Sequence, residues 1–241
     1  MIVKVFKDYQ SMSKACAVMF ANQILEKPDS VLGFATGSTP EGTYSELVKM
    51  YNEKIISFAG VTTFNLDEYV GITRENDQSY YYFMHQHLFN HVDVDKNRVN
   101  LPNTGAKDLE KECSDYENAI KKAGGVDLQI LGIGNNGHIG FNEPCDHFVE
   151  NTNIVSLKQN TIEANARFFK DISEVPTKAV TMGIGTIMRA KKVVLVASGA
   201  NKADIIKRIV CGNIEPNVPA SVLRLHQNVN VLLDGEAGKL L

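Results

Sequence analysis

The sequence predicts an α/β fold, with an open, mainly parallel, Rossmann-like sheet and helices on both faces. Short apolar runs alternate along the chain with segments of helical periodicity. Several runs are almost continuously apolar, as expected for strands that are covered on both faces. The 241 residues contain no low-complexity linker, charge run or internal repeat. We therefore expect a single domain over residues 1–241.

Seven runs are predicted to be strands: residues 2–6, 31–35, 61–66, 126–131, 179–184, 193–197 and 229–233. Three amphipathic stripes between them predict helices. Their members are Tyr44, Leu47, Val48 and Tyr51; Leu109, Cys113, Tyr116 and Ile120; and Ile162, Ala166 and Phe169. Sheets of this kind bind ligands outside the carboxyl ends of their strands, so the loops that follow strands are the candidate sites.

Composition excludes several classes of partner. The net charge is −3, with no basic excess for nucleic acid and no Lys/Arg block for a membrane surface. No run approaches the roughly 18 apolar residues of a membrane helix, and no apolar leader is evident. The four cysteines form no CxxC pair, so we expect free thiols and a cytoplasmic location.

The first candidate loop, ATGSTP, follows the second predicted strand. Gly37 allows close approach to a ligand, while Ser38 and Thr39 supply hydroxyl donors. The start of the following helix adds N–H groups and a partial positive charge, which suit an anion such as phosphate. The alternative is an ordinary turn in which Thr39 caps the helix.

The second candidate loop, NLDEYVG, carries Asp67 and Glu68 at the end of the third predicted strand. A partly desolvated aspartate has a raised pKa and can act as a general base. Adjacent side chains diverge, so only one of the two acids needs to face a site. The alternative is a solvated loop acid or a helix cap.

The third candidate loop, LGIGNNGHIGFNEP, spans residues 131–144 and is rich in glycine. His138 can carry a proton in both directions near neutral pH. Glu143 and Asn136 could orient its ring, Asn136 by accepting the ring N–H. The GxGxxG spacing from Gly132 could instead indicate a dinucleotide site, but no helical stripe follows it. A glycine-rich connector with a buried histidine is the other alternative.

The other histidines give weaker signals. His87 and His91 are four residues apart on a predicted helix and could share a metal ion. No HExxH motif accompanies them, so packing is the favoured interpretation and no metal is expected.

These three loops, in this order and spacing, resemble the glucosamine-6-phosphate deaminase family, and the similarity extends to SYYYFM, ANARFF and SGANKA. The resemblance implies a cofactor-independent hydrolase that turns glucosamine 6-phosphate into fructose 6-phosphate and ammonia in amino-sugar catabolism. A 6-phosphogluconolactonase is the alternative enzyme. A sugar-phosphate-binding regulator on the same fold is the alternative that is not an enzyme.

The resemblance also implies residue roles. Asp67 would move the C2 proton, and His138 would open the sugar ring with the help of Asn136 and Glu143. Gly37, Ser38 and Thr39 would bind the phosphate together with the basic residues Arg167 and Lys202. From the residues alone, Arg167 is equally well explained by an ion pair with Glu163, and Lys202 has no obvious partner.

The chain departs from the family pattern at two places. Many relatives carry aspartate at the position of Asn136, so the ring-opening histidine should be less basic here. The allosteric members of the family use Ser, Arg and Lys residues just after NEP, and here that stretch reads CDHFVENTNIVSLKQ. We therefore expect a monomer in place of a hexamer, and no allosteric activation.

Overall fold

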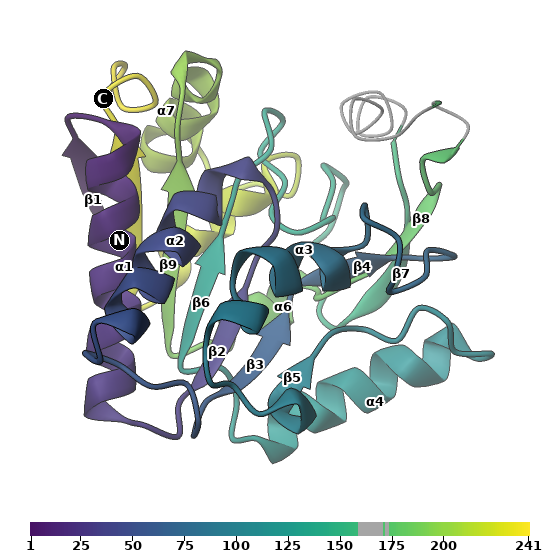
Figure 1. Cartoon of the computed structure of the whole chain (residues 1–241). Coiled ribbons are helices and arrows are strands. Elements are labelled where there is room, and N and C mark those ends of the chain that lie inside the picture. Colours follow the sequence, from purple (N-terminus) through teal and green to yellow (C-terminus); the bar gives the residue numbers. More distant parts are fainter. Residues whose placement is uncertain (159–170, 172–173) are drawn as a thin grey trace.

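The computed structural model describes residues 1–158, 171 and 174–241. Seven parallel strands form the main sheet in the order β1-β10-β9-β6-β2-β3-β5 (Figure 1). Their bounds are β1 Ile2–Phe6, β2 Val31–Phe34, β3 Thr62–Asn65, β5 Val99–Asn100, β6 Leu128–Leu131, β9 Lys192–Ala197 and β10 Val229–Asp234. The predicted parallel α/β sheet is confirmed.

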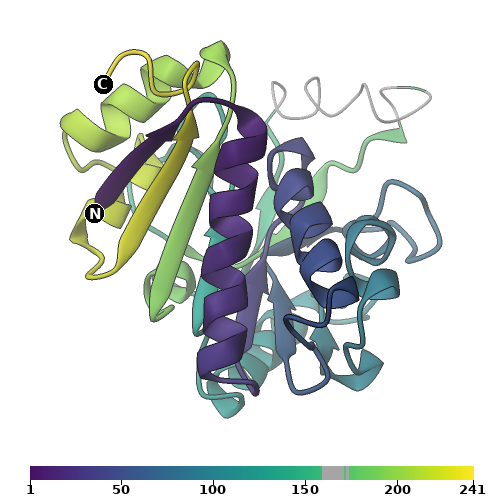
Figure 2. The ribbon, with the colours of Figure 1, turned by 60° about the vertical axis from the view of Figure 1, so that its left-hand side comes forward.

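Helices cover both faces of this sheet. On one face, the ring of Phe34 in β2 lies 5.5 Å from Phe20 of α1 (Tyr9–Glu26) and 5.6 Å from Tyr44 of α2 (Ser38–Asn52). Figure 2 shows these two helices side by side over the strands. On the opposite face, Phe64 of β3 packs 5.6 Å from Tyr116 of α4 (Leu109–Lys122). Successive strand residues point to opposite faces, so both faces bury large apolar side chains.

Shorter helices complete the described part of the chain. They are α3 Tyr80–His87, α6 Ile184–Met188 and α7 Ala203–Cys211, with 3-10 turns η1 Phe89–His91, η2 Lys96–Arg98, η4 Ala200–Lys202 and η5 Pro219–Leu225. None of the described helices is long and apolar enough to cross a membrane. The predicted stripe of Ile162, Ala166 and Phe169 lies outside the described residues.

The strand order reverses direction between β2 and β6. From β2 the chain proceeds outward to β3 and β5, then returns to β6 and continues the other way to β9 and β10. A crevice opens at such a switch point, outside the carboxyl ends of the two strands. The first and third candidate loops leave these two neighbouring strands.

A second, three-stranded antiparallel sheet was not predicted. It has the order β4-β8-β7, with β4 Asp67–Tyr69, β7 Asn153–Ser156 and β8 Lys178–Thr181. The apolar run 179–184 therefore does not join the main sheet, and α6 begins at its last residue. Antiparallel pairing of Asp67 with Thr181 places the second candidate loop on this small sheet, beside the edge of the large one.

Candidate active site

The first loop enters α2 without a side-chain cap. Gly37 precedes the helix with a φ of 101°, a conformation that favours glycine. The helix begins at Ser38, so the alternative in which Thr39 caps it is wrong. Gly37 and Ser38 are exposed, and the first-turn N–H groups point back toward the loop. This arrangement can hold an anion with backbone donors.

The hydroxyl groups of two tyrosines bond to the backbone of this loop and of the start of α2. The Tyr9 hydroxyl donates to the carbonyl of Ser38 at 3.1 Å and accepts from the N–H of Gly42 at 2.8 Å. The buried Tyr44 hydroxyl donates to the carbonyl of Ala35. The loop is therefore fixed before any ligand arrives, which lowers the entropic cost of binding.

Asp67 is buried and begins β4. Burial, and secondly the charge of Glu68, raise the pKa of Asp67 to about 8. A methyl group added at Gly140 would lie 3.4 Å from Asp67 Oδ2, so the second and third loops meet at this carboxyl. A carboxyl that titrates near neutral pH can both accept and return a proton.

In the third loop, His138, Glu143 and Asn136 lie together as predicted. The Nδ1 atom of His138 is 3.3 Å from Glu143 Oε1, within ion-pair range but outside the alignment of a hydrogen bond. Asn136 Nδ2 donates to Glu143 Oε2 at 2.6 Å, and Asn136 Oδ1 accepts the backbone N–H of His138 at 3.1 Å. The expectation that Asn136 accepts the ring N–H is therefore wrong: it orients Glu143 and the loop, and Glu143 faces the ring.

The glycines of this loop do not begin a nucleotide-binding helix. One of them, Gly134, instead gives the His138 ring room to pack. The next element of the described chain after β6 is β7, so the GxGxxG spacing opens no helix and the dinucleotide alternative is wrong. A Cβ atom at Gly134 would lie 2.4 Å from ring atoms of His138. The ring thus packs directly over the Gly134 backbone.

Lys202 reaches the same loop from the turn after β9. Its Nζ atom donates to the carbonyl of Ile133 at 2.8 Å and to Asn135 Oδ1 at 2.7 Å. Lys202 therefore has partners, contrary to the expectation from sequence, and its ammonium group lies at the β2/β6 edge. Arg167 lies outside the described residues.

Tyr80 was not predicted as a site residue, and the sequence left open which of the two acids has which role. The Tyr80 ring stacks on Phe141 of the third loop with a centroid distance of 6.0 Å. Its hydroxyl lies 3.3 Å from that of Tyr69, and the Thr36 side chain of the first loop is a further partner. The first residue of α3 thus contacts all three loops. A tyrosine run alone carries no signal of such contacts, because they are made between distant segments.

Local contacts account for His85 and His87 of α3 and for His91, which lies in η1 and not on the same helix, and the His87 ring packs on Phe83. His85 Nδ1 bonds to the Tyr81 carbonyl, and His91 Nε2 bonds to the Gln86 carbonyl. Among the described residues, three potential metal ligands converge only at Cys145, Asp146 and His147, within 4.8 Å of one another. Asp146 and His147 are exposed, and exposed acidic groups commonly cluster without binding a metal ion.

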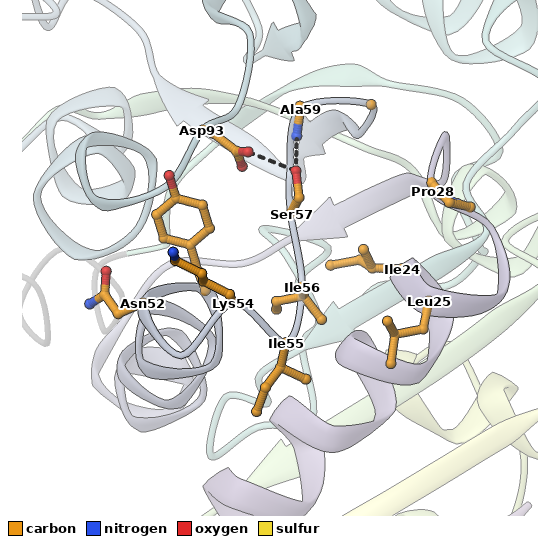
Figure 3. Close-up of a pocket in the computed structure, with 12 residues that line it drawn as sticks. Ile24, Leu25, Pro28, Asn52, Lys54, Ile55, Ile56, Ser57, Ala59 and Asp93 are labelled. Atoms are coloured by element: carbon orange, nitrogen blue, oxygen red, sulfur yellow. Dashed lines mark hydrogen bonds between the residues drawn. The ribbon is translucent and has the colours of Figure 1, made fainter.

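A groove of about 780 Å³ lies at the opposite end of the sheet. Its lining includes Pro28 before β2 and Gly60 before β3, which are the amino ends of those strands. Figure 3 shows mostly apolar side chains there, with the Ser57 hydroxyl donating to Asp93 at 2.7 Å. This groove holds no set of proton-transfer groups. The chemistry is therefore concentrated at the carboxyl edge.

The fold and the site define an α/β protein with a proton-transfer centre and an anion-binding turn at a topological switch point. Residues 8–232 match the family described as glucosamine-6-phosphate isomerases/6-phosphogluconolactonase, and the chain belongs to this family.

Similar proteins include two called glucosamine-6-phosphate deaminase. One, from Clostridium novyi (strain NT), is 55% identical over 236 residues, covering 98% of both chains. The other, from Clostridium botulinum (strain Langeland / NCTC 10281 / Type F), is 53% identical over 241 residues, covering 100% of this chain and 99% of that one.

Solved structures of similar proteins support the same family. One described as a monomeric glucosamine-6-phosphate deaminase has a TM-score of 0.97 at 46% identity and covers all of both chains. A 6-phosphogluconolactonase from Trypanosoma brucei has a TM-score of 0.74 at 20% identity, covering 100% of this chain and 98% of that one, which shows a shared fold alone.

The hydrolase class implied by the sequence resemblance is a poor fit. The similar proteins are called deaminases, and the family description names isomerases. The class is therefore corrected to an isomerase and deaminase.

Changing Asn136 to aspartate is expected to destabilise the folded chain at alkaline pH. The change removes the N–H donor 2.6 Å from Glu143 Oε2 and puts a second carboxylate there. The folded pair then keeps a proton to higher pH than the unfolded chain does. Because the folded pKa is raised, stability is lost as the pH rises, by about 1–3 kcal/mol at pH 9. Urea unfolding at pH 4 and pH 9 measures this difference.

Asn135→Asp is the matched control. It adds the same charge one residue away, beside the Lys202 ammonium group and not beside Glu143. An equal alkaline loss in both variants would contradict the importance of the Asn136–Glu143 contact.

Proposed function

We propose that this protein converts glucosamine 6-phosphate and water into fructose 6-phosphate and ammonia. The observation that carries the proposal is the meeting of a buried Asp67 with the loop of His138 and Glu143 at one edge of the sheet. The deaminase names of relatives with over 50% identity support the same substrate.

The reaction begins with ring opening. His138 moves a proton from O1 to O5 of the pyranose, and the Glu143 carboxylate stabilises the imidazolium that forms in passing. Asn136 holds Glu143 by donating to its second oxygen. The product is the open-chain aldehyde with its C2 proton made acidic by the neighbouring carbonyl.

Asp67 then takes the C2 proton, and the electron pair of the broken C–H bond forms the enolamine. Returning a proton to C1 converts the enolamine into a C2 imine. Water adds to the imine carbon and ammonia leaves, giving the ketose. A carboxyl whose pKa is about 8 suits both steps, because it exchanges its proton near neutral pH. The phosphate would be held at Gly37, Ser38 and Thr39, with Lys202 and Arg167.

A coupled assay of ammonia and fructose 6-phosphate tests the proposal. Both products should appear in equal amounts from glucosamine 6-phosphate, and 6-phosphogluconolactone should not be hydrolysed above the uncatalysed rate. Lactone hydrolysis without ammonia would replace this proposal with the lactonase alternative, and binding without turnover would replace it with the regulator.

Lys202→Met is expected to raise KM with little change in kcat. A charged hydrogen bond to phosphate stabilises ground and transition states alike, by about 1.5–3 kcal/mol, which is roughly 10–100-fold in KM. Steady-state kinetics measure the two constants. Lys207→Met removes an exposed lysine of α7 and should leave both unchanged. A fall in kcat at constant KM would mean that Lys202 acts only by holding Ile133 and Asn135.

We further propose a monomer, in line with the structure described as a monomeric deaminase. Light scattering at micromolar concentration should give the mass of one chain of 26.6 kDa. A cytoplasmic location and a role in amino-sugar catabolism stay predictions.

A further inference from the structure

We propose that Glu68 is a positioning residue for the proton transfer at C2: it ties β4 to α3 and keeps a negative charge fixed beside Asp67. This inference rests on the proposed function, because it assumes that Asp67 is the base. The sequence left open which of the two adjacent acids faces the site. The contacts of Asp67 and Glu68 indicate a separate role for each of these two acids.

The Glu68 carboxylate is held by three backbone donors. Oε1 accepts the N–H groups of Tyr69 at 2.9 Å and Tyr80 at 3.0 Å, and Oε2 accepts that of Tyr81 at 2.9 Å. Glu68 is only 4% exposed. Burial raises the pKa of Glu68, and the three N–H donors oppose this rise by favouring a negative charge at the start of α3.

Helix capping explains part of this arrangement, because Glu68 accepts the N–H groups of Tyr80 and Tyr81, the first two residues of α3. Ser79 already caps α3, because its hydroxyl oxygen accepts the N–H of Tyr82 at 3.0 Å. A buried carboxylate costs free energy unless it is well paired, whereas a neutral oxygen acceptor could also bond the N–H groups at a helix start. Glu68 therefore has a task beyond local structure.

That task lies with its neighbour. In the described part of the chain, no hydrogen bond holds the Asp67 carboxyl, whose pKa is raised by burial and then by the charge of Glu68. The other titratable groups that sense Asp67 are the phenols of Tyr69, Tyr80 and Tyr116, which burial keeps neutral by raising their pKa values. From the third loop and β8, the adjacent groups are the uncharged Gly140 and Thr181.

Fixing the charge makes Asp67 a stronger base. A carboxylate beside a second carboxylate binds a proton more tightly, and removal of a carbon-bound proton is faster with a stronger base. Through Tyr80 and Tyr81, the same bonds hold the α3 start in place, where the Tyr80 ring stacks on Phe141 of the third loop. Glu68 thus sets both the negative charge beside Asp67 and the position of the α3 start.

Glu68→Gln tests the charge while keeping the shape. The rising limb of the plot of kcat/KM against pH should shift to lower pH by about one unit. Above this limb, kcat should fall about 3–10-fold, because the base is weaker. Glu68→Asp keeps the charge and should bring the limb back toward its original position.

Ser79→Ala is the structural control. It removes the α3 cap and leaves the charge beside Asp67 intact. It should lower the stability of the fold without moving the limb. If Glu68→Gln and Ser79→Ala lose activity alike and neither moves the limb, Glu68 is a structural residue and the proposal is wrong.

A measurement without turnover separates this inference from the proposed function. The pH dependence of unfolding, with and without Asp67→Asn, reports the pKa of Asp67. Repeating the comparison in the Glu68→Gln background should lower that pKa by about one unit. An unchanged pKa would overturn the role of Glu68. Failure of the original chain to release ammonia would overturn the proposed function alone.

Discussion

Asp67→Asn is expected to reduce the release of ammonia by about 10²–10⁴-fold, the usual contribution of a positioned general base. Asparagine has nearly the same shape but cannot accept the C2 proton. KM should change little, because the proposed phosphate contacts lie on other loops. The coupled assay measures this result, and near-normal turnover would contradict the assignment of Asp67.

The same substitution is expected to stabilise the fold at alkaline pH. The folded pKa of Asp67 is about 8, well above the value of about 3.9 of an unfolded aspartate. The folded state therefore holds the proton more tightly, and its stability is lost as the pH rises from about 4 to about 8. Removing the group should restore on the order of 2–5 kcal/mol at pH 8 and little at pH 4.

Asp127→Asn is the control, because it is expected to change the stability of the fold in the opposite direction. Hydrogen bonds with Lys191 and Lys27 hold the pKa of this buried carboxyl below its usual value, against the effect of burial. Its stabilisation is present at neutral pH and lost in acid, so its removal should destabilise the chain at pH 7. Urea unfolding from pH 4 to pH 9 compares the two. Destabilisation of both variants at pH 8 would contradict a raised pKa at Asp67.

The location of the site could be predicted because it follows from the periodicity of the strands. Parallel strands bring their carboxyl ends to one edge, so the loops after residues 31–35, 61–66 and 126–131 were expected to meet. A Cβ atom added at Gly140 would lie 3.4 Å from Asp67 Oδ2, which agrees with that expectation. Local pattern and sheet geometry were sufficient here.

The small antiparallel sheet could not be predicted in the same way. Its strand β4 has three residues, two of them acidic, and shows no alternation. Its partner β8 lies more than 100 residues away in the sequence, so the pairing depends on tertiary contacts and not on local preference. The apolar run 179–184 therefore indicated a strand but not the sheet to which it belongs.

The orientation of the site side chains was the other feature that could not be predicted from the sequence. Sequence placed Asn136 near His138, but the direction of its amide depends on the turn at Gly137, where φ is 90°. The turn brings Asn136 Nδ2 to Glu143 and leaves its oxygen for a backbone N–H. Asn136 therefore contacts the His138 backbone directly, and its contact with the His138 ring is made through Glu143.

His138→Gln is expected to reduce kcat/KM for cyclic glucosamine 6-phosphate by about 10²–10⁴-fold. Glutamine can hydrogen-bond but cannot carry a proton between O1 and O5. An open-chain analogue of the substrate needs no ring opening, so its enolisation at Asp67 should change less than about threefold. Equal losses with both compounds would contradict the ring-opening role and assign the histidine to a later step.

Combining this variant with Glu143→Gln tests how the two side chains act together. Glu143 contacts the ring at 3.3 Å and, on the proposed mechanism, acts only by stabilising the imidazolium. Once the imidazole is gone, the carboxylate has no charge to stabilise, so the double variant should be no slower than His138→Gln alone. Additive losses would mean that Glu143 contacts the substrate itself.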